Sequence, residues 1–127
     1  MEWEIFMTEQ VEDFLDALYE SDRDSRRLVN QAILVLERVG PGAGRPLVDS
    51  ITASRLANLK ELRPSSRKRT EIRILFAFDP WRSAILLVAG DKSENFSRWY
   101  RDAVPEAEER FALYLEERQG EMTDERD

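Results

Sequence analysis

The side chains of this chain that could act on a substrate are mainly basic and lie in the middle of the sequence. Arg73 lies within the apolar run 72–78, Lys60 and Arg63 precede it by thirteen and ten residues, and Lys92 follows a second apolar run. A cation within strand-like sequence costs free energy unless an anion meets it, so such a cluster indicates an anion site. Arginine suits a phosphate through its planar fork, and a lysine or tyrosine with a lowered pKa could transfer protons.

The composition narrows this chemistry. The 127 residues contain no cysteine and no histidine, which excludes disulfides, thiolate metal sites, a cysteine nucleophile and a histidine base. We therefore expect catalysis by Lys, Arg, Tyr, Ser, Thr or carboxylate groups, with no metal and no cofactor. The size predicts a single domain over residues 1–118, followed by a charged, frayed tail at 119–127. Because no apolar run is long enough to cross a bilayer and no basic leader is present, we expect no membrane association and a cytoplasmic location.

The charge is unevenly distributed. The net charge is −7, yet residues 45–101 carry 12 Lys and Arg against 6 Asp and Glu. Residues 1–20 carry 7 acids and no base, and residues 102–127 carry 10 acids and 3 bases. A protein that binds a polyanion normally presents a positive field to it. We therefore expect the acidic ends to lie away from the basic middle.

Further candidate contacts for a polyanion lie near these cations. One is a run of three bases in a turn, Arg67, Lys68 and Arg69. Such a run is usually a solvated loop, but its place between cation-bearing strands favours phosphate contact. The other follows the last strand and comprises Arg98, Trp99 and Tyr100. Trp99 could stack on a base or anchor the last helix, and we favour the anchor; for Tyr100 the two alternatives are balanced.

The expected elements give the order β-α-α-β-β-β-α, an α+β fold. Thr8 and then Ser21 or Asp22 cap two helices that follow a strand at 3–7, and Gly40 ends the second. A long loop over 40–52 leads to strands at 55–63, 70–79 and 83–91, and Pro105 begins the closing helix. We predict a small, mostly antiparallel four-stranded sheet, with the N-terminal helical hairpin packed on one face and a C-terminal helix.

Strand alternation sets the direction of the basic side chains. Ile72, Ile74, Phe76 and Phe78 share one face, so Arg73 points to the other and could be shortened without opening the main core. The simplest partner for Arg73 is a carboxylate on the neighbouring strand, such as Glu61. Alternation also puts Lys60 and Arg63 on opposite faces, so one site can use both only through a bulge or a strand end.

This order, together with Leu59-Lys60-Glu61-Leu62-Arg63, Glu71-Ile72-Arg73, Gly90-Asp91-Lys92 and Trp99-Tyr100, resembles the toxins of the RelE/ParE superfamily. The resemblance is strongest to the HigB-like, phage Gp49-like branch. It implies a type II toxin that cuts mRNA on the ribosome without a metal and is neutralised by a cognate antitoxin, a small helix-turn-helix protein. The positions that match the catalytic residues of these toxins are Arg73, Lys60, Arg63, Lys92 and, more loosely, Tyr100.

Two other functions stay open at this point. A ParE-like protein would inhibit DNA gyrase without catalysis, and an inactive relic would only bind a partner. The cations spread over three strands favour the endonuclease, because a gyrase inhibitor has no need of them. Neither the codon preference nor the ribosome requirement can be predicted from the residues.

Overall fold

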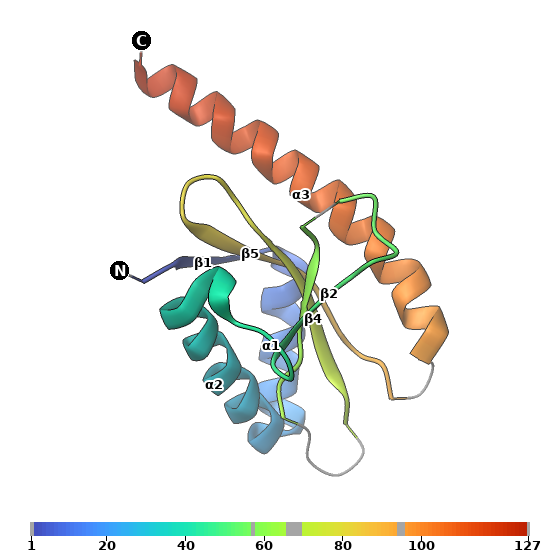
Figure 1. The fold of residues 1–127 in the computed structure, drawn as a ribbon. Helices are drawn as coiled ribbons and strands as arrows, with labels where there is room; N and C mark the ends of the chain where they lie inside the picture. Colours follow the sequence, from blue (N-terminus) through green and yellow to red (C-terminus); the bar gives the residue numbers. More distant parts are fainter. Residues whose placement is uncertain (1, 57, 66–69, 94–95, 127) are drawn as a thin grey trace.

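The computed structural model describes residues 2–56, 58–65, 70–93 and 96–126, without the side chains of Phe96 and of residues 124–126. Its helices and strands follow one another in the order that Figure 1 shows. They are β1 (Glu4–Met7), α1 (Glu9–Ser21), α2 (Arg23–Val39), the 3-10 turn η1 (Gly40–Gly42), β2 (Val48–Ser50), β3 (Lys60–Leu62), β4 (Ile72–Phe78), β5 (Ser83–Asp91) and α3 (Phe96–Arg126).

The sheet has five strands in the order β1-β5-β4-β3-β2. β1 runs parallel to β5, and the other three pairings are antiparallel. The predicted α+β class is confirmed, but the count of four strands is wrong. The extra strand, β2, lies in the predicted loop 40–52 and has only three residues, too few for an alternating pattern. It forms because β3 offers an edge with which Val48 and Ser50 can pair.

The N-terminal hairpin packs on one face of the sheet, as predicted. Thr8 caps α1 by accepting from the Val11 amide, and Asp22 caps α2 by accepting from the Ser25 amide. The buried side chains of the two helices meet the β4 face that alternation predicts to be apolar. This core contains Val11, Leu15, Val29, Ala32, Leu36, Ile72, Ile74 and Phe76.

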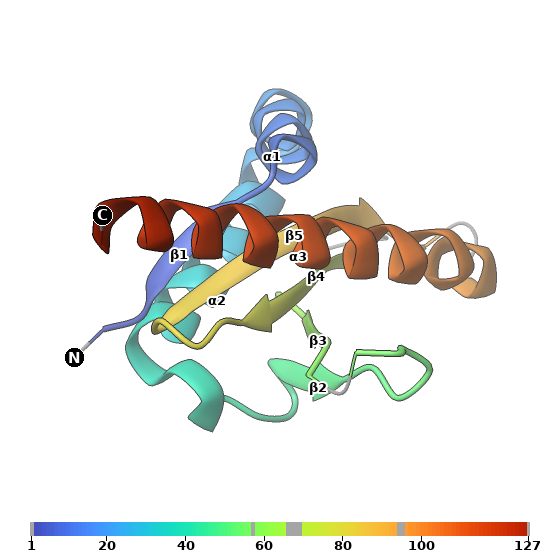
Figure 2. The same cartoon turned by 90° about the horizontal axis from the view of Figure 1, so that it is seen from above.

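The opposite face of the sheet is covered as well. α3 crosses it as one long rod (Figure 2) and packs Ala103, Ala107 and Phe111 against Leu75 and its β5 neighbours. Arg73 lies on this covered face and is only 7% exposed. Arg73 points away from the main core, as predicted, but its own side of the sheet is covered by α3. The small cost expected for shortening Arg73 stays a prediction, and its burial argues against that prediction.

α3 begins earlier and ends later than predicted. Pro105 lies inside the helix rather than in its first turn. A proline within a helix removes one backbone hydrogen bond, a loss that contacts between the preceding turns and the sheet offset. Trp99 and Tyr100 make these contacts by packing against the core between α3 and the sheet. The helix continues through Gly120 to Arg126, and whether the segment 119–127 frays in solution stays a prediction. The strand predicted from residue 55 begins only at Lys60, because residues 52–56 form turns beside α3.

Gly90 allows α3 to approach the sheet closely. A Cβ at Gly90 would lie 2.1 Å from Nε1 of Trp99 and 2.9 Å from its Cε2, closer than atoms can pack. The Gly-Asp-Lys end of β5 is thus shaped by the indole that lies on it. This contact anchors the first turn of α3 and, with it, the neighbouring Tyr100.

We predict opposite effects for two glycine-to-alanine changes. Gly90→Ala should destabilise the fold by about 1–3 kcal/mol, the usual cost of overpacking, because Trp99 must move. Gly120→Ala is the matched control, since a Cβ there meets nothing within 4 Å and alanine favours a helix interior by roughly 0.5–1 kcal/mol. Urea unfolding of both variants measures whether the free energy of unfolding falls for Gly90→Ala and rises for Gly120→Ala. An unchanged midpoint for Gly120→Ala would indicate that this part of α3 frays.

Candidate functional site

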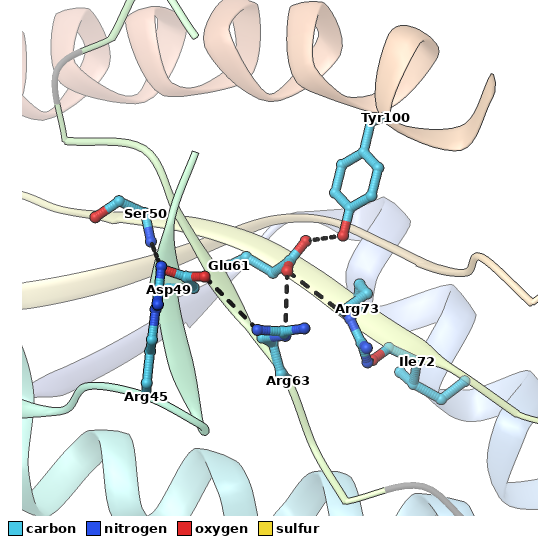
Figure 3. Close-up of polar contacts among 8 residues, drawn as sticks. All are labelled: Arg45, Asp49, Ser50, Glu61, Arg63, Ile72, Arg73 and Tyr100. Atoms are coloured by element: carbon cyan, nitrogen blue, oxygen red, sulfur yellow. Dashed lines mark hydrogen bonds and ion pairs between the residues drawn. The ribbon is translucent and has the colours of Figure 1, made fainter. Parts of the chain in front are cut away.

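Two of the cations predicted to form a site, Arg63 and Arg73, meet at one buried carboxylate, that of Glu61 (Figure 3). Oε1 of Glu61 lies 3.5 Å from Nε of Arg63 and 3.8 Å from Nε of Arg73, and the Tyr100 hydroxyl donates to Oε2. β3 supplies Glu61 and the adjoining Arg63, β4 supplies Arg73, and α3 supplies Tyr100. We call Glu61, Arg63, Arg73, Lys92 and Tyr100 the Glu61 cluster.

Arg73 is held tightly within this cluster. Its side chain is 9% exposed, and Nη1 donates to the Ile72 carbonyl oxygen over 2.8 Å. Nε has no hydrogen-bond partner among the described residues, since its distance to Glu61 is that of an ion pair only. A buried donor without an acceptor costs on the order of 1–3 kcal/mol. Nε of Arg73 is therefore a buried donor whose nearest carboxylate is that of Glu61, at ion-pair distance.

Arg63 lies at the more open side of the cluster, with its side chain 34% exposed. Its Nη1 also lies 3.6 Å from Oδ2 of Asp49. The other oxygen of that carboxylate, Oδ1, accepts a hydrogen bond from Nε of Arg45 at 3.1 Å. Asp49 comes from the edge strand β2, the strand that the sequence did not predict. The added strand thus holds Arg63 from its other side.

Lys92 and Tyr100 complete the cluster. Nζ of Lys92 lies 5.2 Å from the centre of the Tyr100 ring, and Lys92 is only 4% exposed. Burial lowers the pKa of Lys92, and the charge of Arg73 lowers it further. Burial raises the pKa of Tyr100, and its hydrogen bond to Glu61 adds to the increase. Lys92 is thus a weaker base than an ordinary lysine and loses its proton more readily, whereas Tyr100 keeps its proton at neutral pH.

The two pKa shifts give Lys92 and Tyr100 different roles in proton transfer, whereas the sequence allowed either residue to take either role. The lowered pKa of Lys92 is the direction in which a lysine could replace histidine as a proton acceptor. A tyrosine with a raised pKa stays protonated and can give a hydrogen bond. The expectation of a lowered pKa is therefore met by Lys92 and is wrong for Tyr100.

The structure separates the remaining predicted site residues. Lys60 pairs with Phe76 in the sheet and so faces the α1 and α2 side, away from Glu61. Arg98 is exposed on the first turn of α3, and Trp99 packs on Gly90 as the anchor that we favoured. The run 67–69 lies outside the described residues. Alternation had left Lys60 and Arg63 as alternatives, and only Arg63 joins the Glu61 cluster.

Glu61 was predicted as a pairing partner for Arg73 but not as the centre of a site. Its signal in the sequence is that strand alternation places Glu61 on the same face as Leu59, and the structure buries both residues. An acid in such a strand is buried and needs cations nearby. Asp49 carried no comparable signal, since it lies in a segment rich in glycine and proline.

The acidic helix α1 lies away from the cluster. Its side chains pack in the core on the other face of the sheet, whereas the cluster lies on the α3 face. α3 itself carries Arg98 and Arg101 beside Tyr100, and most of its acids follow from Glu106 onward. The separation expected from the charge pattern therefore holds for α1 and, in part, for α3.

The described residues hold no group of three or more His, Cys, Asp or Glu side chains that could bind a metal ion together. In the same part of the chain, each helix is too short or too polar to span a membrane.

Alkaline pH should test the environment of Tyr100. Tyr114 is its matched control, because it donates to Asp79 over 2.6 Å and its pKa is also raised, by burial and by that bond. A raised folded pKa stabilises the fold below the ordinary tyrosine pKa of about 10, and this contribution is lost as pH rises above it.

Tyr100→Phe and Tyr114→Phe should each cost about 1.5–3 kcal/mol at pH 8, the value of a hydrogen bond to a charged group. Each should also flatten the loss of stability between pH 9 and 11. Lys92 acts in the opposite sense, since its folded pKa is lowered, so urea midpoints are compared between variants at each pH. A variant as steep as wild type would contradict the raised pKa at that position.

The sequence is similar to those of known proteins. Residues 13–112 match the family described as "Phage derived protein Gp49-like (DUF891)". The chain is 52% identical over 94 residues to a Mycobacterium tuberculosis (strain ATCC 25618 / H37Rv) protein named "Putative toxin HigB2", an alignment that covers 74% of this chain. It spans only 47% of that relative's length.

A second relative from the same strain, named "Putative toxin HigB3", is 46% identical over 116 residues. This alignment covers 91% of this chain and 96% of the relative. The family match and both relatives confirm the resemblance that the strand and helix motifs indicated. The chain belongs to the phage-derived Gp49-like family, within its HigB-like branch.

Proposed function

We propose that this chain is the toxin of a type II toxin-antitoxin system and that it cuts mRNA on the ribosome. The names of its relatives support the toxin assignment. The observation that carries the endonuclease proposal is the Glu61 cluster, in which two arginines and a protonated tyrosine meet at one anion beside a lysine of lowered pKa. These are the groups that a phosphate and its two reacting oxygens require.

The proposed reaction uses the nucleophile that RNA itself carries. The 2′-oxygen attacks the adjacent phosphorus, the bond to the 5′-oxygen breaks, and the products are a 2′,3′-cyclic phosphate and a 5′-hydroxyl end. Lys92, in its neutral form, accepts the proton of the 2′-hydroxyl, and Tyr100 donates a proton to the leaving 5′-oxygen. Arg63 and Arg73 neutralise the charge that develops on the phosphate.

Glu61 holds these groups ready while no RNA is bound. Its carboxylate contacts the same donors that the phosphate needs, so the phosphate must take over part of these contacts. Nε of Arg73 contacts Glu61 only as an ion pair at 3.8 Å, so a phosphate that replaces this contact would gain a hydrogen bond that Glu61 does not make. The cost of bringing the arginines together is met during folding, which leaves binding energy for the reaction.

The partners follow from this role. We propose a cognate antitoxin, a small helix-turn-helix protein, that blocks the toxin until it is degraded, and the translating ribosome in the cytoplasm as the target. The net charge of −7 is unusual for a protein that approaches RNA. The position of α1 on the other face of the sheet supports an approach through the α3 side.

The Arg73 role is tested by Arg73→Lys, which keeps a cation beside the buried Glu61 but removes the planar fork. Loss of one group that stabilises transition-state charge costs on the order of 2.7–4 kcal/mol, or roughly 10²–10³ in rate. Cells that induction of wild type arrests should therefore grow when Arg73→Lys is induced. Arg110→Lys is the matched control, because Arg110 pairs with Glu106 on α3 outside the cluster and should stay toxic.

Mapping of mRNA ends after induction distinguishes the functions. Cuts that carry 2′,3′-cyclic phosphate and 5′-hydroxyl ends support the proposed reaction, and 5′-phosphate ends would refute it. Growth arrest with intact mRNA and inhibited gyrase would favour the ParE-like alternative. A folded wild-type protein that arrests nothing and needs no antitoxin would favour the inactive relic.

The two tyrosine variants separate catalysis from stability in the same assay. Tyr100→Phe and Tyr114→Phe each lose a hydroxyl that donates to a carboxylate, but only Tyr100 belongs to the cluster. We expect Tyr100→Phe to reduce cleavage by about tenfold or more, in keeping with the 10²–10⁴-fold usual for a proton donor. Tyr114→Phe should cut at nearly the wild-type rate at 25 °C. Equal losses in both variants would place Tyr100 in a structural role only.

A further inference from the structure

A groove with a volume of about 440 Å³ lies beside the Glu61 cluster. It runs between residues 50–53, which include the end of β2, and the first half of α3. Tyr100 belongs to both sites, because its hydroxyl donates to Glu61 and its side chain lines the groove. A molecule bound in the groove would therefore lie next to the cations of the cluster. The volume is within the roughly 300–1,000 Å³ typical of small-ligand sites.

The lining of the groove differs in charge from the rest of this acidic surface. It contains Arg101 and no carboxylate among the residues that the structure describes. Four other hollows formed by described residues each include at least one acid. These acids comprise Asp16 and Glu20, then Glu2, Glu4 and Glu37, then Glu108 and Glu109, and finally Glu117. In a chain of net charge −7, a groove lined by a cation and no acid favours an anionic ligand.

The other lining side chains suit a nucleobase. Ile51, Val104 and Pro105 give the groove apolar walls, and Thr52 and Ser97 add hydroxyl groups at exposed positions. A base has apolar faces and a hydrogen-bonding edge, so it can use both kinds of surface at once. A phosphate of the same nucleotide would then lie close enough to the Arg101 guanidinium to be attracted by its positive charge.

We propose that this groove binds the nucleobase adjacent to the phosphate that the Glu61 cluster cleaves, and so sets a nucleotide preference at the cut. The inference rests on the proposed endonuclease function and adds a ligand site to it. The base in the groove would fix the position of its own ribose and phosphate, since Tyr100 links the two sites without an intervening residue.

The experiment compares two uncleavable probes by fluorescence anisotropy. One is a dye-labelled trinucleotide with 2′-O-methyl riboses, and the other has the same backbone but lacks the bases. Base contacts should make the first probe bind roughly tenfold more tightly, within the range of stacking contacts. Ala53→Leu fills the groove from an exposed position and should remove this difference. Ala112→Leu, at an exposed alanine of an acid-lined hollow, is the matched control and should keep it.

A second pair of variants tests the charge. Arg101→Glu should weaken binding of the trinucleotide at least tenfold, whereas Arg27→Glu, which changes the net charge equally on exposed α2, should weaken it about twofold or less.

The proposal is overturned if both probes bind equally, if neither binds, or if Ala53→Leu and Ala112→Leu behave alike. None of these results decides the endonuclease proposal, which depends on the mapped mRNA ends and on Arg73→Lys. Cyclic phosphate ends together with equal binding of the two probes would refute the groove alone.

Discussion

The structure depends on one buried negative charge, the carboxylate of Glu61. Removing a carboxylate from water costs several kcal/mol, and this cost is recovered only if cations and donors surround it closely. Glu61 is 4% exposed, and β3, β4 and α3 each place such a group beside it. The need to compensate this buried charge therefore brings two arginines and a tyrosine to one point on the sheet.

The second constraint is the cover that α3 provides. Two glycines accept an indole against the backbone, Gly90 below Trp99 and Gly40 below Trp3, and each would clash if it had a side chain. The contact at Gly90 fixes the first turn of α3 over the end of β5, where Lys92 follows. Tyr100 is the next residue after Trp99, so the anchor of the helix also sets the position of a catalytic candidate. The packing of Trp99 therefore determines where the Tyr100 side chain lies.

The acidic and basic side chains lie in different layers of the molecule. The sheet separates the acidic α1 from the cations on its other face, and the low exposure of Arg73 and Lys92 shields them from solvent screening. A chain with a negative net charge can thus have a site that is locally positive. Arg63 is the most exposed of the three cations in the Glu61 cluster.

The sequence by itself determined the elements whose pattern is local. The caps at Thr8 and Asp22 and the alternation of β4 follow from a few neighbouring residues, and β5 was predicted with the bounds that it has. The presence of Arg73 in an apolar strand pointed to an anion site, and the absence of histidine and cysteine limited the residue types that could act there.

Only the tertiary structure decided which cations share a site. The three-residue strand β2 exists because β3 pairs with it, and α3 runs through Pro105 because its early turns pack on the sheet. The choice of Arg63 over Lys60 follows from the register of β3 against β4. The opposite pKa shifts of Lys92 and Tyr100 arise from burial and from neighbours distant in the chain. Interactions between distant residues set all of these features, and a local pattern of residue types cannot encode them.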